Sequence, residues 1–141
     1  MPQSLARMIV HVVFSTKNRL PLIPKENLSD LHGYIAGICR KIGSEAYRVG
    51  GTENHVHIAC RLPRTITLAR LVEQVKSASS KWMKVEKLAS SSFQWQDGYG
   101  AFSISPSHLI RLMDYIDNQE VHHRVNSFND EVREIIDKYE N

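Results

Sequence analysis

The segment from His55 to Leu62 is the feature that most constrains how this chain can fold. It runs His-Val-His-Ile-Ala-Cys-Arg-Leu, and the alternation at its start is typical of a β-strand. Residues two positions apart in a strand face the same way, so His55 and His57 would lie side by side. Their neighbours Val56 and Ile58 would point into the opposite layer. Two imidazoles placed in this way supply two ligands of a divalent metal site.

Apolar residues divide the whole chain into strands and helices in a definite order. Apolar runs predict strands over 7–15, 45–51 and 55–62, with short strand-like pieces over 93–96 and 99–104. Apolar residues every three or four positions predict four helices. The first begins near Lys25 and ends at Gly43, and the second follows a cap at Thr67. The third opens at Ser105-Pro106, and the last spans about 129–139. This order is that of the ferredoxin-like (split βαβ) fold.

We therefore predict a single α+β domain over residues 1–141, with a core of about 7–125 and a C-terminal helical extension of about 126–141. In the ferredoxin-like antiparallel sheet the first and third strands are central neighbours, and the helices cover one face. The other face is then free to carry a site. The two cysteines, Cys39 and Cys60, lie in apolar runs and are expected to be reduced core thiols.

Composition narrows the class of protein without identifying it. A chain of 141 residues with 42% apolar residues is long enough for one soluble core. Its formal charge of +3 and isoelectric point of about 9.0 are compatible with a polyanionic partner. No apolar run is long enough to span a membrane and no signal peptide is evident, so a cytoplasmic protein is expected.

The predicted third helix presents two different faces. Its apolar stripe consists of Leu109, Leu112, Met113 and Ile116. Tyr115 and Gln119 lie one turn apart on a second face, about 6 Å from each other, which is a workable spacing around one cation. Taken alone, a tyrosine such as Tyr115 is usually an amphipathic boundary residue, and a glutamine such as Gln119 is usually solvent-exposed. Together with a His-x-His strand, the two residues become candidates for a nucleophile and a metal ligand.

Three segments together resemble a known family. They are His55-Val56-His57 followed by Ile-Ala, the stretch 93–103 (Phe-Gln-Trp-Gln-Asp-Gly-Tyr-Gly-Ala-Phe-Ser), and 115–119 (Tyr-Ile-Asp-Asn-Gln). The run 10–19 (Val-His-Val-Val-Phe-Ser-Thr-Lys-Asn-Arg) is also similar. Over roughly residues 7–125 the chain resembles the single-tyrosine HUH transposases of small bacterial insertion sequences, which include the repetitive-palindrome-associated tyrosine transposases.

The resemblance implies a metal-dependent enzyme that cuts and rejoins single-stranded DNA beside hairpins, working as a homodimer. It makes His55 and His57 the metal-binding pair, Gln119 the third ligand, and Tyr115 the nucleophile that forms a 5′-phosphotyrosine. The tyrosine helix of one subunit commonly completes the site of the other, and the sequence leaves open whether Tyr115 acts within its own chain. Mg²⁺ or Mn²⁺ is the expected ion, and imidazole ligands favour Mn²⁺.

Several further residues are candidates for DNA contacts. The cations are Arg19, Arg61, Lys76, Lys81 and Lys84. The aromatic residues are Trp95, Tyr99 and Phe102, which could stack on bases or belong to the core. The alternative for each cation is a solvated surface charge, which is the commoner case. His11 would either line the DNA-facing side of the sheet or be a buried core histidine, and Tyr99 is a rival nucleophile without a ligand-type residue beside it.

Two other functions stay open beside the transposase. One is a non-catalytic binder of single-stranded or hairpin DNA, such as a domesticated regulator, which would need neither the metal nor Tyr115. The other is a hydrolase of a different phosphodiester, in which the cation activates water and no protein–DNA adduct forms.

Overall fold

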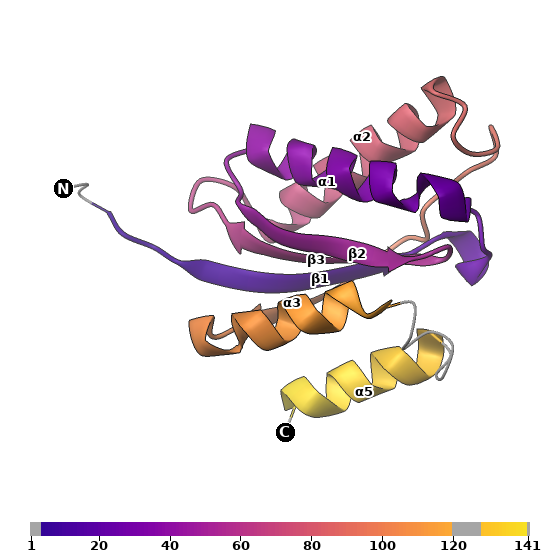
Figure 1. The fold of residues 1–141 in the computed structure, drawn as a ribbon. Helices are drawn as coiled ribbons and strands as arrows, with labels where there is room; N and C mark the ends of the chain where they lie inside the picture. The colour runs from indigo at the N-terminus through magenta and orange to yellow at the C-terminus, as the bar shows by residue number, and fades with distance from the viewer. Residues whose placement is uncertain (1–3, 120–127, 141) are drawn as a thin grey trace.

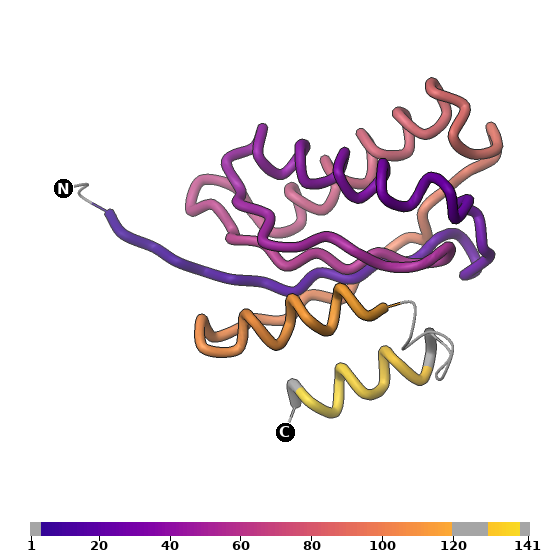
Figure 2. The backbone as a smooth tube through the Cα atoms, viewed as in Figure 1, coloured from indigo at the N-terminus to yellow at the C-terminus, as the bar shows by residue number. Residues whose placement is uncertain are grey.

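One antiparallel sheet positions the two histidines. The computed structural model describes residues 4–119 and 128–140, and its four strands follow the order β2-β3-β1-β4 (Figures 1 and 2). The strands are β1 (Met8–Ser15), β2 (Ala46–Thr52), β3 (His55–Leu62) and β4 (Gly100–Ile104). The first and third strands are the central pair, as the sequence predicted, and Val13 stands opposite His57. The ferredoxin-like α+β prediction is therefore confirmed.

Helices lie against both faces of this sheet (Figure 1). The helices α1 (Leu28–Lys41) and α2 (Leu68–Val85) cover one face. The helices α3 (Leu109–Asp117) and α5 (Phe128–Glu140) lie beneath the other face, which the sequence had left free for a site. The reason is apolar surface, because Ile9 and Ala59 on that face pack against Leu112 and other residues of α3. Three short 3-10 turns span 17–19, 25–27 and 106–108.

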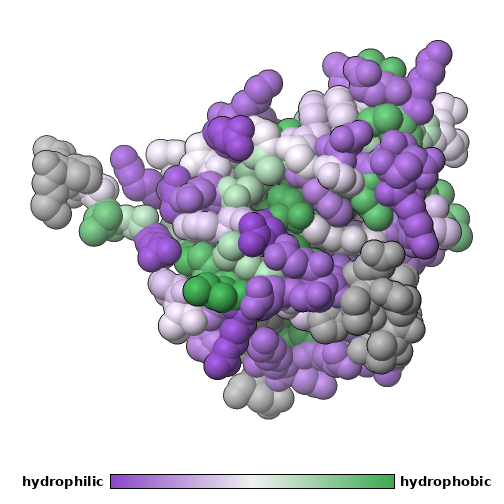
Figure 3. Space-filling model, viewed as in Figure 1, coloured by the Kyte–Doolittle hydropathy of each residue, from purple (hydrophilic) through white to green (hydrophobic). Residues whose placement is uncertain are grey.

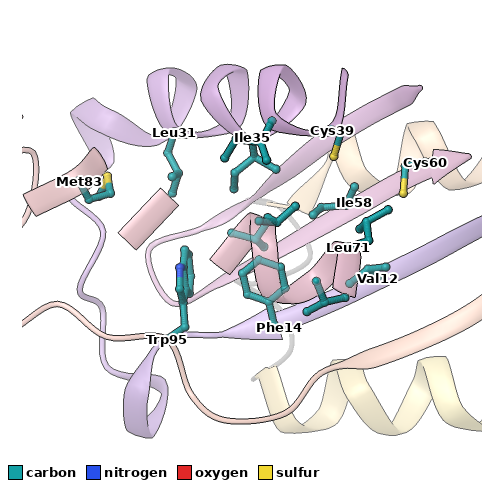
Figure 4. Packing of buried hydrophobic residues seen from close by; sticks show 14 of the residues in the cluster. Val12, Phe14, Leu31, Ile35, Cys39, Ile58, Cys60, Leu71, Met83 and Trp95 are labelled. Carbon is teal, nitrogen blue, oxygen red and sulfur yellow. The ribbon is translucent and has the colours of Figure 1, made fainter. Parts of the chain in front are cut away.

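The main core lies between the sheet and the first two helices (Figure 4). Phe14 of β1 packs edge-on against Trp95, whose ring centre is 4.8 Å away. The indole N–H of Trp95 donates to Ser79 Oγ of α2 at 3.1 Å, so this aromatic residue is a satisfied core residue. Cys39 and Cys60 are buried free thiols, and burial raises the pKa of Cys39 to about 12. Both are therefore inert parts of the core.

The ends of two predicted elements differ in detail from the sequence pattern. Thr67 Oγ1 accepts from the backbone N–H of Arg70 and caps α2 as predicted. Ser105 makes no such cap, because residues 106–108 form a 3-10 turn and its hydroxyl pairs with His108 Nδ1 at 2.5 Å. The stretch 93–96 forms one isolated bridge, between Trp95 and Thr16, in place of a strand.

The surface shown in Figure 3 is mostly hydrophilic, and its apolar residues form separate patches. In the described parts of the chain, every helix is too short or too polar to cross a membrane.

Gly51 supports the turn that starts the histidine strand. Its φ of +149° is one that glycine adopts readily and other residues rarely adopt. A Cβ at this position would also lie 2.2 Å from the carbonyl oxygen of His55. We expect Gly51→Ala to lower the free energy of unfolding by roughly 3 kcal/mol or more, and the melting temperature by about 10 °C. Gly37→Ala is the control, because a Cβ at this position in α1 has no atom within 4 Å and should slightly stabilise the helix. Thermal unfolding of both variants, followed by circular dichroism, measures the difference.

Candidate active site

Strand β3 holds His55 and His57 against the α3 and α5 side of the sheet, and both side chains are 0% exposed. The Nδ1 atom of each ring has its own partner. His55 Nδ1 lies 2.7 Å from Asn54 Oδ1, and His57 Nδ1 lies 2.8 Å from His11 Nε2. A ring that donates through Nδ1 keeps the lone pair of Nε2 for a metal ion. These partners therefore orient the two rings as a ligand pair.

The residues that follow α3 complete the predicted set. Gln119 is 1% exposed, and its Oε1 lies 2.7 Å from His55 Nε2. Tyr115, one turn earlier, sets its ring edge-on to His57, with 5.6 Å between ring centres. The structure thus brings the histidine pair, Gln119 and Tyr115 together within a single chain.

Glu131 of α5 also belongs to this cluster, although sequence reasoning missed it. It is 2% exposed, with Oε1 at 3.2 Å from His57 Nε2 and Oε2 at 3.4 Å from His55 Nε2. Its Oε1 also accepts the hydroxyl hydrogen bond of Tyr115. Glu131 lies one turn before Ile135 on the apolar side of α5, and this acidic residue on a buried stripe was the available signal.

The chemistry of these atoms fits a divalent cation. The ligand atoms of His55, His57 and Glu131 lie within 4.8 Å of one another. Neither His57 Nε2 nor Glu131 Oε2 makes a hydrogen bond to any residue that the structure describes, although both are buried. Burial lowers the pKa of His57 to about 4, partly offset by Glu131, so the ring is neutral near pH 7. A neutral ring nitrogen and a buried carboxylate whose nearer oxygen lies 3.2 Å from it form a binding site for a positive ion.

The same contacts shift the ionisation of Tyr115 and Glu131 in opposite directions. Burial and the adjacent carboxylate of Glu131 raise the pKa of Tyr115 well above its usual value, so its phenol is protonated. Burial alone would raise the pKa of Glu131. The hydroxyl of Tyr115, which donates to Glu131, and the surrounding side chains of His55 and His57 nevertheless hold the pKa of Glu131 well below its usual range, so Glu131 is ionised. The phenol therefore already donates to a charged acceptor.

Buried histidines predict an acid-sensitive fold. Burial lowers the pKa of His11 to about 3, and the pKa values of His32 and His57 to about 4, from 6.5. Below pH 6.5 the unfolded chain therefore binds more protons than the folded one, so stability falls as the pH drops toward 4. The slope approaches about 1.4 kcal/mol per pH unit for each such proton. Urea unfolding of EDTA-treated protein across this window measures the slope, which His32→Gln should reduce.

The candidate DNA-contacting cations lie in several different places. Lys81 and Lys84 are exposed on α2, on the face of the sheet away from the histidine pair. Lys76 donates to the carbonyl groups of residues 96 and 98, and Arg61 donates to the carbonyl of residue 43. Arg19 is exposed, and its carbonyl accepts from Asn54 Nδ2 at 3.4 Å, next to the start of β3. Of these five, only Arg19 has a described hydrogen bond to a residue adjacent to the histidine pair.

The aromatic candidates for DNA contacts also lie in different places. Trp95 is in the core, Tyr99 is 42% exposed, and Phe102 is half-buried with its ring centre 6.2 Å from that of His11. His11 is 1% exposed. The sequence offered two alternatives for His11, a buried histidine or a residue on the face of the sheet that carries the site. Both hold, because His11 is buried and contacts His57 on that face.

Comparisons with known proteins agree with this geometry. A family model described as "Transposase IS200 like" matches residues 4–119. A candidate transposase from Deinococcus radiodurans R1 is 19% identical, with a TM-score of 0.67, over 84% of this chain and 95% of that chain. A REP-associated tyrosine transposase bound to a REP hairpin is 15% identical, with a TM-score of 0.61, over 87% and 73% of the two chains. No curated protein matches. The family model spans most of this chain, so the chain belongs to the IS200-like transposase family.

Proposed function

We infer that this protein is a metal-dependent transposase that cuts and rejoins single-stranded DNA through a 5′-phosphotyrosine on Tyr115. The observation that carries the inference is the buried cluster in which the Tyr115 hydroxyl donates to Glu131, and Glu131 faces both histidine Nε2 atoms. A nucleophile, a proton acceptor and a set of metal ligands thus lie within one cluster. Membership of the transposase family supports the reaction class.

The proposed ligands of the ion are the Nε2 atoms of His55 and His57, Glu131 Oε2 and Gln119 Oε1. Two imidazoles and two oxygen ligands suit Mn²⁺ or Mg²⁺, and the imidazoles favour Mn²⁺. When bound, the ion would neutralise charge on the scissile phosphate and on the departing 3′ oxygen. Asn54 and His11 hold the two rings in the ligand orientation.

Tyr115 and Glu131 divide the covalent step between them. The Tyr115 oxygen forms a bond to phosphorus while the bond from phosphorus to the 3′ oxygen breaks. The phenol proton passes to Glu131 Oε1, and the departing oxygen becomes a 3′ hydroxyl by taking a proton from solvent. One phosphodiester replaces another, so the step is reversible and needs no ATP. The 3′ hydroxyl can later attack the phosphotyrosine and reseal the strand.

The proposed substrate is single-stranded DNA with hairpin ends. The REP-associated tyrosine transposase of similar fold binds a REP hairpin. A homodimer remains a proposal that rests on family resemblance. Because one chain here brings Tyr115 beside its own histidine pair, exchange of helices between subunits is not needed to assemble the cluster. Sedimentation of the protein as a monomer at micromolar concentration would argue against the dimer.

A covalent-adduct assay tests the proposed function. The probe is a labelled single strand that spans an imperfect palindrome flanking the gene, incubated with the protein and Mn²⁺. We expect a labelled protein band that survives denaturing electrophoresis and is abolished by EDTA. Labelled product without an adduct would instead indicate a phosphodiester hydrolase.

A non-catalytic hairpin binder is the second candidate. It is favoured by the half-buried position of Tyr115, whose hydroxyl is already engaged by Glu131. Such a binder would retain the hairpin equally well in EDTA and after His57→Ala, and would form no adduct under any condition.

A further inference from the structure

A cavity of about 460 Å³ lies between β4, α3 and α5, next to the metal-ligand cluster. Leu112 and Ile135 form an apolar part of its lining. Tyr115 and His11 line it on the side of the cluster, where His11 contacts His57. The space therefore opens onto the proposed nucleophile.

Two cations line this cavity from different helices. Arg111 belongs to α3 and Lys138 to α5, and both are exposed. Glu134 also lines the cavity, and its carboxylate would repel a phosphate. A bound polyanion is therefore expected to pass along Arg111 and Lys138, with any neutral ring turned toward Leu112.

We propose that this cavity binds one nucleotide of the single-stranded DNA, the one adjacent to the phosphodiester that Tyr115 attacks. The inference rests on the proposed function and adds where the strand lies. The volume is in the usual range for sites that bind small molecules, about 300–1,000 Å³. The half-buried ring of Tyr115 at the wall offers a stacking surface for a base, and the cations offer contacts for the flanking phosphates.

The shape of the site favours a single strand over a duplex. A base can enter the cavity only if it is unstacked from its neighbours, which costs a few kcal/mol in a duplex and little in a single strand. Seating one base here would bring the adjoining phosphodiester toward the Tyr115 hydroxyl. The cavity would therefore orient the strand for attack as well as bind it.

Binding in EDTA tests this proposal without cleavage. The probe is a short oligothymidine with one central 2-aminopurine, whose fluorescence falls when the base stacks. We expect the wild-type protein to quench it. We expect the double variant Arg111→Glu/Lys138→Glu to bind about tenfold more weakly or worse, and to lose the quenching.

The matched control is Arg40→Glu/Arg133→Glu, which replaces exposed cations on α1 and α5 that do not line the cavity. Each replacement changes the charge by −2, so both double variants take the formal charge from +3 to −1. Equal weakening by the two double variants, or unchanged quenching in the first, would overturn the cavity proposal alone. Failure of the wild-type protein to bind the probe would likewise overturn the cavity proposal, whereas the proposed function fails only if the palindromic strand forms no adduct. Arg111→Gln/Lys138→Gln repeats the test if charge reversal impairs folding.

Discussion

Replacing Tyr115 by phenylalanine is expected to abolish the covalent adduct and to reduce strand cleavage by about 1,000-fold or more. The ring of Tyr115 packs edge-on against His57, and phenylalanine would keep that contact. The variant loses only the hydroxyl that donates to Glu131 and that would attack phosphorus. DNA binding should therefore survive while the chemistry is lost. Adduct formation and equilibrium binding, measured on the same labelled strand, separate the two effects.

Tyr99→Phe is the matched control for this experiment. Tyr99 is the rival tyrosine in the sequence, and it is 42% exposed. It also lies with α2 and Trp95 around a separate groove. We expect this variant to form the adduct at the wild-type level. An adduct that persists in Tyr115→Phe and disappears in Tyr99→Phe would transfer the nucleophile assignment to Tyr99.

His57→Ala is expected to weaken Mn²⁺ binding by about 100-fold or more and to suppress cleavage to the same degree. The ring is one of the two proposed nitrogen ligands. Its loss also removes the contact of 3.2 Å between His57 Nε2 and Glu131 Oε1. Isothermal titration with Mn²⁺ measures affinity directly. The rise in melting temperature on adding Mn²⁺ gives a second measurement, since ligand binding to the folded state stabilises it.

Two further variants show whether this loss is specific. His32→Gln removes another histidine, a partly buried one outside the group of ligand atoms around Glu131, and should leave the Mn²⁺ affinity unchanged. Glu131→Gln keeps the shape of the side chain but removes its charge, and should weaken Mn²⁺ binding while preserving the fold. Unchanged affinity in both His57→Ala and Glu131→Gln would show that the ion binds elsewhere.

The sequence predicted the parts of the site that local periodicity determines. Alternation in β3 fixes the common direction of His55 and His57, and the turn between Tyr115 and Gln119 fixes the spacing of that pair. Both patterns depend only on residues a few positions apart. The approach of the two pairs to each other came from the family resemblance, and the structure brings them within hydrogen-bonding distance.

Glu131 shows what local patterns cannot supply. It lies 74 residues after His57 in the sequence, on a helix whose position depends on how α3 and α5 pack against the sheet. No periodicity relates two elements that are joined by tertiary packing alone. For the same reason, the sequence left the second face of the sheet open, whereas apolar residues of β1 and β3 are covered by α3. The engagement of Lys76 by two carbonyl groups is likewise a tertiary result.

The position of Glu131 on α5 has a thermodynamic consequence for ion binding. An ion held by β3 and by this carboxylate would join the sheet to the last described helix, as a cross-link does. Ion affinity and the docking of α5 would then be linked, and each would strengthen the other by the same factor. A substitution on α5 far from any ligand atom, if it loosens this helix, would therefore lower the affinity for the ion. In this protein the position of the helix and the strength of ion binding would be two measures of a single equilibrium.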